Sequence, residues 1–268
     1  MQAIDVHGHF GPYDRGTRAL TDRMMSADIE TVSQRALACG IQMTVVSAIR
    51  ALIPYRGDAV RGNEDAVAAA ERQDDIRFWV VIDPLRRETY EQADRLLVHP
   101  RCKGIKIHPH AHAYEIAAHG ETLFAFAGAR NALVLTHSGD PGSYPEHFLP
   151  FVDAYPDVNL ILAHLGNSDD GSVARQVDAI KAARHGNVYV DTSSSRSMIS
   201  GLIEWAVEEI GPDRILFGTD TPLYWAASQK ARIETAEIDD DAKAAILFRN
   251  AARLLNETVD SGTAAEPG

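Results

Sequence analysis

Short apolar runs rich in Val and Ile recur along the chain, and each is followed by a longer stretch rich in Ala, Glu and Arg with helical spacing. This alternation predicts repeated strand and helix units around a parallel sheet. The eight runs lie at residues 2–9, 42–49, 77–83, 103–109, 131–138, 158–165, 187–193 and 214–220. Eight parallel strands are the number that closes a (β/α)8 barrel, or TIM barrel.

The segments between these runs have the pattern of helices. Residues 61–73 and 88–98 place apolar side chains three and four positions apart, and Gly40, Gly186 and Gly211 stand where helix-ending turns are needed. An open doubly wound sheet would repeat the same units. A closed barrel is favoured because unusual polar residues follow several different strands, as catalytic groups do at the carboxyl end of a barrel.

The length of 268 residues suits one barrel, which needs about 250 residues, without spare domains. We therefore predict a single domain over residues 1–258. Residues 259–268 are small and polar, and they predict a loose C-terminal tail.

Charge and composition narrow the class of partner. The 26 basic and 38 acidic residues give a net charge of -12, which repels polyphosphate backbones and anionic membranes, so we expect neither as a partner. The chain begins without a basic segment followed by an apolar stretch, and no window approaches the roughly 18 apolar residues of a membrane span. Cys39 and Cys102 are too few for a disulfide framework and predict two free, mostly buried thiols. These features predict a cytoplasmic protein.

The first strand ends in Asp5-Val6-His7-Gly8-His9. Strand side chains alternate, so the two imidazoles of His7 and His9 lie on one face and can tilt onto a single metal ion. Taken alone, such a pair is more often two solvated histidines than a metal site.

Three further strands are followed by one imidazole or carboxylate, placed between a buried apolar run and a turn residue. These are His137 after the fifth strand, His164 after the sixth and Asp220 after the eighth. Because the carboxyl ends of barrel strands converge, the polar groups would form a buried cluster that is unfavourable without compensation. A bound cation compensates such a cluster, so the pattern predicts a metal ion at this end of the barrel.

Seven motifs run through nearly the whole chain in a fixed order, namely IDVHGH, RFWVVIDP, GIKIHP, THSG, AHLGN, FGTDTP and FRNAARLL. In this order they resemble the amidohydrolase superfamily, and in particular its amidohydrolase-2 branch of metal-dependent hydrolases and decarboxylases built on TIM barrels. Singly, most of these motifs are unspecific; together they are highly specific.

The resemblance implies a role for each polar residue at a strand end. His7 and His9 match the metal ligands of the first strand. His137 matches the ligand of the fifth strand, and Asp220 matches the carboxylate of the eighth, which touches both the metal and the attacking water. His164 matches a histidine of the sixth strand that acts as an acid or base. Asp220 and His164 are therefore the predicted catalytic residues.

Three neutral imidazoles and one carboxylate suit zinc, and a further position stays open to a water whose pKa zinc lowers to about 7. Manganese, cobalt and iron accept similar ligands and remain alternatives. Asp220 can accept the proton of the water as it attacks, and His164 can polarise the substrate or protonate the leaving group. Asp5 is predicted to support the ligands through hydrogen bonds.

Three residues are candidates for substrate binding. Lys106 and His108 share a face of the fourth strand, and Arg196 follows the seventh, where a guanidinium can bind a carboxylate through two hydrogen bonds. In some amidohydrolases a lysine on the fourth strand is carbamylated and bridges two metal ions. We favour one ion, with Lys106 an ammonium that pairs with a substrate carboxylate or with Asp5.

The other histidines and a few residues that follow strands are weaker candidates for the site. His110 and His112 lie beyond the fourth strand and are predicted to be solvated or to contact substrate. Surface positions are predicted for His99, His119, His147 and His185. Secondary candidates for specificity, because they follow strands, are Arg50, Tyr55 and Trp225.

Three functions fit these residues. Hydrolysis of a small organic amide, lactone or related ester by metal-activated water is favoured as the broadest behaviour of the family. The alternative is non-oxidative decarboxylation of an aromatic or unsaturated acid, because several members of the branch are lyases with the same ligands. A TatD-type nuclease is the weakest reading, since that family carries Gly-Glu where this acidic chain has Gly104-Ile105-Lys106. Short loops indicate a small-molecule substrate, and the resemblance implies a homodimer.

Overall fold

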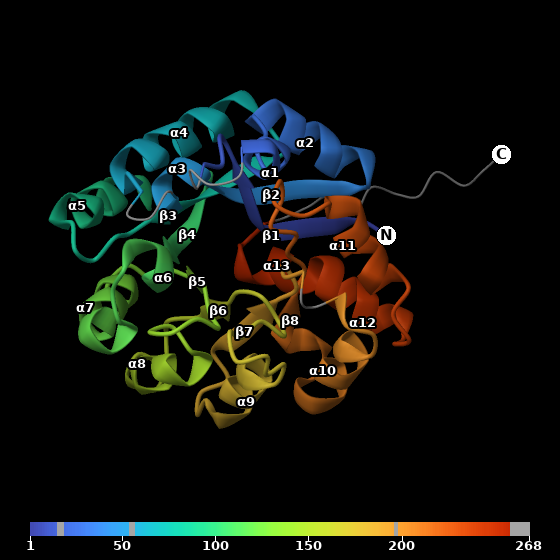
Figure 1. Cartoon of the computed structure of the whole chain (residues 1–268). Coiled ribbons are helices and arrows are strands. Elements are labelled where there is room, and N and C mark those ends of the chain that lie inside the picture. Colours follow the sequence, from blue (N-terminus) through green and yellow to red (C-terminus); the bar gives the residue numbers. More distant parts are fainter. Residues whose placement is uncertain (15–18, 54–56, 196–197, 258–268) are drawn as a thin grey trace.

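Eight parallel strands follow one another in chain order around one sheet (Figure 1). The structure, a computed structural model, describes residues 1–14, 19–53, 57–195 and 198–257. The strands are β1 (Ala3–Phe10), β2 (Ile41–Ala48), β3 (Ile76–Val81), β4 (Cys102–Ile107), β5 (Val134–Thr136), β6 (Leu160–Leu162), β7 (Val188–Asp191) and β8 (Ile215–Leu216). All eight coincide with predicted runs, and the predicted TIM barrel is confirmed. Tyr55, Arg196 and the predicted tail lie outside the described residues.

Strands β5, β6 and β8 end earlier than the sequence predicts, before the polar residues that follow them. His164 and Asp220 have positive backbone φ angles of 72° and 58°. This left-handed conformation cannot continue a strand. The polar residues therefore lie just beyond the ladders, at the carboxyl end of the barrel.

The barrel closes between β1 and the segment that follows β8. Backbone hydrogen bonds run from Val6 N to Phe217 O at 3.0 Å, from Asp220 N to His7 O at 2.7 Å and from His9 N to Thr221 O at 2.6 Å. The bonds of this seam satisfy backbone groups that would otherwise be buried without partners. They also bring the eighth-strand carboxylate beside the two histidines of the first strand.

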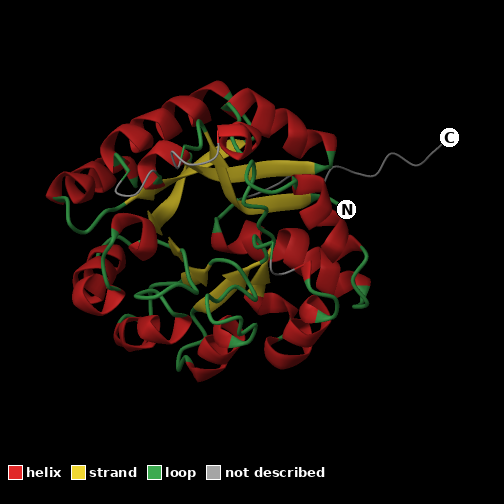
Figure 2. Ribbon diagram, in the orientation of Figure 1, coloured by secondary structure: helices red, strands yellow, loops and turns green. Residues whose placement is uncertain are grey.

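Helices cover the outside of the strands (Figure 2). They are α1 (Ala19–Met24), α2 (Ile29–Ala38), α3 (Ile49–Leu52), α4 (Ala59–Arg72), α5 (Arg87–Leu96), α6 (Pro109–His112), α7 (Ile116–Gly128), α8 (Leu149–Ala154), α9 (Arg175–Ala182), α10 (Leu202–Ile210), α11 (Ala226–Glu234), α12 (Asp240–Ala244) and α13 (Asn250–Leu254). Short 3₁₀ segments η1 (Pro145–Phe148) and η3 (Pro212–Arg214), and the π-helix η4 (Ala245–Arg249), join them.

The two helices predicted in detail are present as α4 and α5. Helix α4 begins after Asp58, whose carboxylate accepts a hydrogen bond from the backbone N–H of Arg61 at 3.3 Å. Such an N-cap satisfies one of the free N–H groups of the first turn. Small side chains on one face, including Ala66 and Ala70, are buried and pack toward β2 and β3.

The core has an inner and an outer part. One buried cluster, formed by strand residues such as Val45, Trp79 and Leu135, also includes Ala251 and Leu255 from the end of the last helix. Other clusters join alternate strand residues to the surrounding helices. This apolar filling occupies the barrel away from the polar residues, so the polar side chains are confined to the carboxyl end.

Two sequence expectations concern the chain as a whole. Cys39 and Cys102 are free, and each is partly buried. Within the described residues, no helix is both long enough and apolar enough to cross a membrane.

Gly104 allows β4 to lie against β5, and it provides a test of the fold. Its φ is 142°, and a Cβ atom there would overlap the carbonyl oxygen of Leu133, which accepts a hydrogen bond from Ile105 N at 2.8 Å. We expect Gly104→Ala to lower the free energy of unfolding by roughly 1–3 kcal/mol beyond the backbone strain, as overpacking does. Denaturant titration measures this quantity.

Gly171→Ala is the matched control. Gly171 also has a positive φ, 82°, but a Cβ atom there meets nothing within 4 Å. Its substitution should therefore cost only the conformational strain, roughly 1–2 kcal/mol. Equal losses in the two variants would show that the close approach of β4 and β5 does not constrain position 104.

Candidate metal centre

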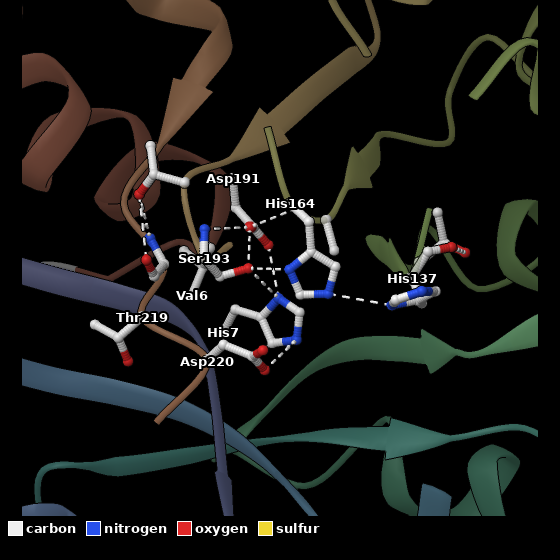
Figure 3. Close-up of polar contacts among 12 residues, drawn as sticks. Val6, His7, His137, His164, Asp191, Ser193, Thr219 and Asp220 are labelled. Carbon is white, nitrogen blue, oxygen red and sulfur yellow. Dashed lines mark hydrogen bonds and ion pairs between the residues drawn. The ribbon is translucent and has the colours of Figure 1, made fainter. Parts of the chain in front are cut away.

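Polar residues from several strands line one cavity of about 250 Å³ at the carboxyl end of the barrel. The structure brings together every predicted ligand and acid–base residue, namely His7, His9, His137, His164 and Asp220. Lys106 and His108 from the fourth strand line the same cavity. Figure 3 shows His7, His137, His164 and Asp220 of this centre, with His7 and His164 side by side.

The first-strand histidines and the eighth-strand carboxylate form the tightest group. His7 Nε2 and His9 Nε2 lie 3.2 Å apart, and Asp220 Oδ1 lies 3.1 Å from His9 Nε2 and 3.7 Å from His7 Nε2. One ligand atom from each residue lies within 4.8 Å of the others, and all three residues are buried. This spacing can hold one metal ion.

The far nitrogens of these two rings are already hydrogen bonded. His7 Nδ1 lies 2.8 Å from Asp191 Oδ2, and His9 Nδ1 lies 3.1 Å from the carbonyl oxygen of Ser47. A neutral imidazole has one N–H, and a carboxylate or carbonyl oxygen can only accept, so these contacts place the proton on Nδ1 in each ring. The Ser47 hydroxyl, 3.0 Å from His9 Nδ1, can accept from the same N–H. Burial, and next the charge of Lys106, lower the pKa of His7, which keeps the ring neutral.

Both Nε2 atoms therefore direct lone pairs toward each other across 3.2 Å. Lys106 Nζ lies 3.1 Å from His7 Nε2 and can donate a hydrogen bond to it. The lone pair of His9 Nε2 still faces His7 Nε2 and the carboxylate of Asp220. Two facing lone pairs beside a carboxylate repel one another unless a cation lies between them. Metal-bound histidines usually donate their other N–H to a carboxylate or carbonyl, as these do. The donor set fits a divalent metal ion.

His137 and His164 repeat this arrangement next to the first pair, since the ring of His164 stacks on that of His7. His164 Nε2 lies 3.1 Å from His137 Nδ1, while His164 Nδ1 lies 2.8 Å from Ser193 Oγ. His137 Nε2 is hydrogen bonded to Asp140. Burial lowers the pKa of His164 to about 3 and also lowers the pKa of His137, so both rings are neutral. His137 lines the cavity, but its ring does not belong to the tight group of His7, His9 and Asp220.

The backbone at two of these positions is held in a strained conformation. A non-glycine residue in the left-handed region costs on the order of 1 kcal/mol, and such residues cluster at functional sites. Asp220 is held there by its hydrogen bond to His7 O, and His164 by a 3.0 Å hydrogen bond from its N–H to Asp191 Oδ1. Burial alone would raise the pKa of Asp220, but its contact with His9 and the charge interactions with the neighbouring imidazoles hold it below its ordinary value.

Asp5 supports the first strand as the sequence predicts. It accepts hydrogen bonds from His7 N at 2.9 Å, from Thr219 N at 3.0 Å and from Thr219 Oγ1 at 2.5 Å. These bonds tie the strand of the histidines to the segment that carries Asp220. Burial raises the pKa of Asp5 to about 7.

Lys106 is a buried cation beside the centre, with 1% of its surface exposed. Burial lowers the pKa of its ammonium group to about 8. The prediction that it pairs with Asp5 is wrong: its hydrogen-bond partner is His7, and among the described residues no carboxylate lies within 4.0 Å of its Nζ. His108 lines the cavity as predicted and stacks on His137, with ring centroids 4.1 Å apart and planes at 10°.

Other predicted positions lie away from the cavity. His110 is exposed, but His112 is fully buried in α6, with its Nε2 2.9 Å from the carbonyl oxygen of Ala51. The expectation that His112 is solvated or contacts substrate is therefore wrong, because the segment after β4 forms the short helix α6, and His112 points inward to the backbone of α3. None of the four histidines assigned to the surface lines the cavity. Arg50 pairs with Asp65 at 3.3 Å, and Trp225 is 60% exposed outside the cavity.

Three residues of the centre were missed by the sequence analysis. Asp191 and Ser193 follow the apolar run of β7, and Asp140 lies three residues after His137. Asp191 had a usable signal, because it ends an apolar run and precedes small polar residues, as the other strand-end residues do. Ser193 and Asp140 had none, since serine and aspartate are ordinary loop residues.

The remaining cavity wall is mainly apolar or aromatic. Its residues are Tyr13, Met25, Ile49, Leu52, Ile53, Leu223 and Tyr224, joined by the polar Asn167 and Ser194. The cavity thus combines charged and polar groups with apolar side chains, and it suits a small organic molecule.

Comparisons with known proteins agree with this architecture. A crystal structure of 2,6-dihydroxybenzoate decarboxylase complexed with 2,6-dihydroxybenzoate is similar, with a TM-score of 0.76 and 16% identity over 96% of this chain and 100% of that chain. A dihydroxybenzoic acid decarboxylase from Polaromonas sp., with bound manganese and 2-nitroresorcinol, has a TM-score of 0.72 and 17% identity over 95% and 97%. An uncharacterized TIM-barrel protein from Bordetella bronchiseptica has a TM-score of 0.72 and 21% identity over 96% and 99%.

At these identities the structural matches establish the fold alone. No curated protein matches the sequence. The family model described as Amidohydrolase, of the amidohydrolase-2 type, matches residues 4–256. This span contains all of the barrel except the first residue of β1, together with all the residues of the centre, so the chain belongs to the amidohydrolase family in its amidohydrolase-2 branch.

Proposed function

We propose that the protein is a metal-dependent decarboxylase that acts on a small aromatic acid. The observation that carries this proposal is Lys106, a buried ammonium group beside the centre with no carboxylate partner among the described residues. A buried charge is unfavourable unless an opposite charge pairs with it. The carboxylate of an acid substrate would supply that charge, whereas a neutral amide, lactone or ester would leave Lys106 unpaired.

The cavity supports the same class of substrate. Its volume of about 250 Å³ lies below the roughly 300–1,000 Å³ of pockets for drug-sized ligands. Ile49, Leu52 and Leu223 contribute apolar side chains to the cavity wall, against which a planar ring could be buried while its carboxylate faces Lys106. Similar folds in known structures include decarboxylases of dihydroxybenzoic acids, one of them with bound manganese. Hydrolysis, which the sequence analysis favoured, remains an untested prediction.

Four residues are proposed to hold one divalent ion: His7, His9, His137 and Asp220. A bound ion would act as a Lewis acid that neutralises the substrate carboxylate and stabilises the negative charge that develops as the bond breaks. Zinc and manganese both accept nitrogen and oxygen ligands of this kind. Zinc was predicted from the sequence, and manganese is found in a protein of similar fold.

Side chains of the cavity would position the substrate and deliver the proton that the ring carbon needs. Decarboxylation breaks the bond between a ring carbon and the carboxylate carbon and forms a carbon–hydrogen bond, so each turnover needs one proton at the ring. Lys106 would hold the carboxylate, and the apolar wall would hold the ring and exclude water. Asp220 and His164, which both line the cavity, are the groups proposed to move the proton.

The first prediction concerns metal content. Elemental analysis of the purified protein should find one divalent ion per chain, because an uncharged or ammonium Lys106 offers no bridging oxygens for a second ion. His7→Ala should lose most of this metal, since it removes one of two facing imidazoles. His164→Asn should keep the metal and lose turnover.

Circular dichroism of each variant controls for folding. Two ions per chain would contradict the single-ion proposal and favour a carbamylated Lys106 in a binuclear hydrolase. Full metal content in His7→Ala would show that the ligand assignment is wrong.

The second prediction concerns the reaction itself. The metal-loaded protein should release carbon dioxide from a member of a panel of hydroxylated benzoates that includes 2,6-dihydroxybenzoate, and should leave the matching methyl esters and amides intact. Lys106→Met should raise KM for the acid by about 30-fold or more, since losing one partner of a buried charge pair costs about 2–5 kcal/mol.

Lys103→Met is the matched control, because Lys103 stands on the same strand but pairs with Glu257 at the opposite end, at 2.5 Å. It should leave KM unchanged. Cleavage of an ester or amide without carbon dioxide release would replace the decarboxylase proposal by the hydrolase reading.

A further inference from the structure

The buried hydroxyl group of Ser193 links the rings of His7 and His164 in the metal centre. Ser193 Oγ lies 3.0 Å from His7 Nδ1 and 2.8 Å from His164 Nδ1, and it is hydrogen bonded to Asp191 Oδ1 (Figure 3). Neither Ser193 nor Asp191 is exposed to solvent. The rings of His7 and His164 stack at a centroid distance of 4.9 Å, so both depend on the same two residues for their orientation.

The hydrogen bonds of Asp191 admit one arrangement of protons. Oδ2 accepts from His7 Nδ1, and Oδ1 accepts from the backbone N–H groups of His164 at 3.0 Å and Ser193 at 2.9 Å as well as from the Ser193 hydroxyl. A serine hydroxyl has one proton and can accept further bonds. Because that proton goes to the carboxylate, Ser193 Oγ accepts from His164 Nδ1–H.

The same atoms could be read as a second metal site. A ligand atom each from His7, His164 and Asp191 lies within 4.8 Å of the others. The hydroxyl of Ser193 lies among these three side chains and bonds to each of them. Ions bind nitrogen and oxygen ligands at about 2.0–2.2 Å, so an ion there would have to displace the hydroxyl. The group is therefore a hydrogen-bonded hub, and we define Asp191 and Ser193 as this hub.

We propose that the hub divides two positioning roles between its members. Asp191 holds His7 so that Nε2 is unprotonated and faces the metal ligands, and Ser193 holds His164 so that Nε2 faces the cavity without a proton. Because Ser193 is itself held by Asp191, the hub couples the metal ligand to the acid–base residue. The kinetic part of this inference rests on the proposed function, and the orientation part does not.

Three variants of the full-length protein test the division of roles. Asp191→Asn should weaken zinc binding by about 10- to 100-fold, the usual effect of removing the partner of a metal-bound histidine, because an amide cannot accept at both atoms. Ser193→Ala should leave zinc affinity within about threefold of wild type, because His7 keeps Asp191. Ser138→Ala is the matched control: its buried hydroxyl donates to Ala163 O at 2.7 Å and, among the described residues, is hydrogen bonded to no histidine of the centre.

Nuclear magnetic resonance can measure directly which ring nitrogen of His164 carries the proton. Long-range ¹H–¹⁵N spectra of the histidine-labelled, zinc-loaded protein should show His164 as the Nδ1–H form in the wild type and in Ser138→Ala, and as a mixture of both forms in Ser193→Ala. With an acid that the wild type decarboxylates, Ser193→Ala should lower kcat by about 10- to 100-fold, part of the 10²–10⁴ that acid–base catalysis supplies, at little changed KM.

Clear outcomes would overturn the inference. A His164 that stays in the Nδ1–H form in Ser193→Ala, or a loss of zinc affinity in that variant as large as in Asp191→Asn, would remove the proposed division. If Ser193→Ala fails to fold, Ser193→Cys keeps the shape of the side chain with a weaker hydrogen-bonding group and should give the same change to a smaller degree. The spectra and the zinc titrations need no substrate, so failure of the decarboxylase proposal leaves them decisive.

Discussion

The closure of the barrel is the constraint on which the functional site depends. β8 is only two residues long, and the ring is completed by backbone hydrogen bonds between β1 and the irregular segment that follows β8. The bond from Asp220 N to His7 O belongs to this seam, so the last carboxylate and the first histidine meet because the sheet closes. Asp5 adds hydrogen bonds across the same seam. Fold stability and site geometry therefore share the same contacts.

The hydrogen-bond partners of the four histidines determine which ring nitrogen of each carries the proton. His7, His9, His137 and His164 each have one ring nitrogen directed to an acceptor, which is a carboxylate, a carbonyl or a hydroxyl already committed to a carboxylate. Neutral rings then turn their second nitrogens, without protons, toward the cavity. Burial reinforces this state for His7, His137 and His164 by lowering their pKa values. A centre built of facing lone pairs is stable only with a cation, which is why the geometry fits a metal ion.

The fold and the polar strand ends could be predicted from sequence because both follow local rules: strand alternation, apolar runs and the convergence of strand ends in a barrel. His7 and Asp220 meet as those rules require. The roles of Asp191 and Ser193 could not be predicted, because they arise only when barrel closure brings β7 within one strand of β1 and the Ser193 hydroxyl reaches both rings. The burial of His112 likewise depends on its hydrogen bond to the backbone of Ala51, a contact between distant segments that periodicity does not encode.

The balance of charge separates reactions that share the same ligand motifs. Asp191, Asp220 and Asp140 each pair with a histidine of the centre. Lys106 is a buried cation that has no carboxylate within 4.0 Å of its Nζ among the described residues. The carboxylate of an acid substrate would give Lys106 that partner, and loss of carbon dioxide would remove the contact, which would favour product release. A neutral ester or amide offers neither effect, so the charge of Lys106 favours an acid as substrate.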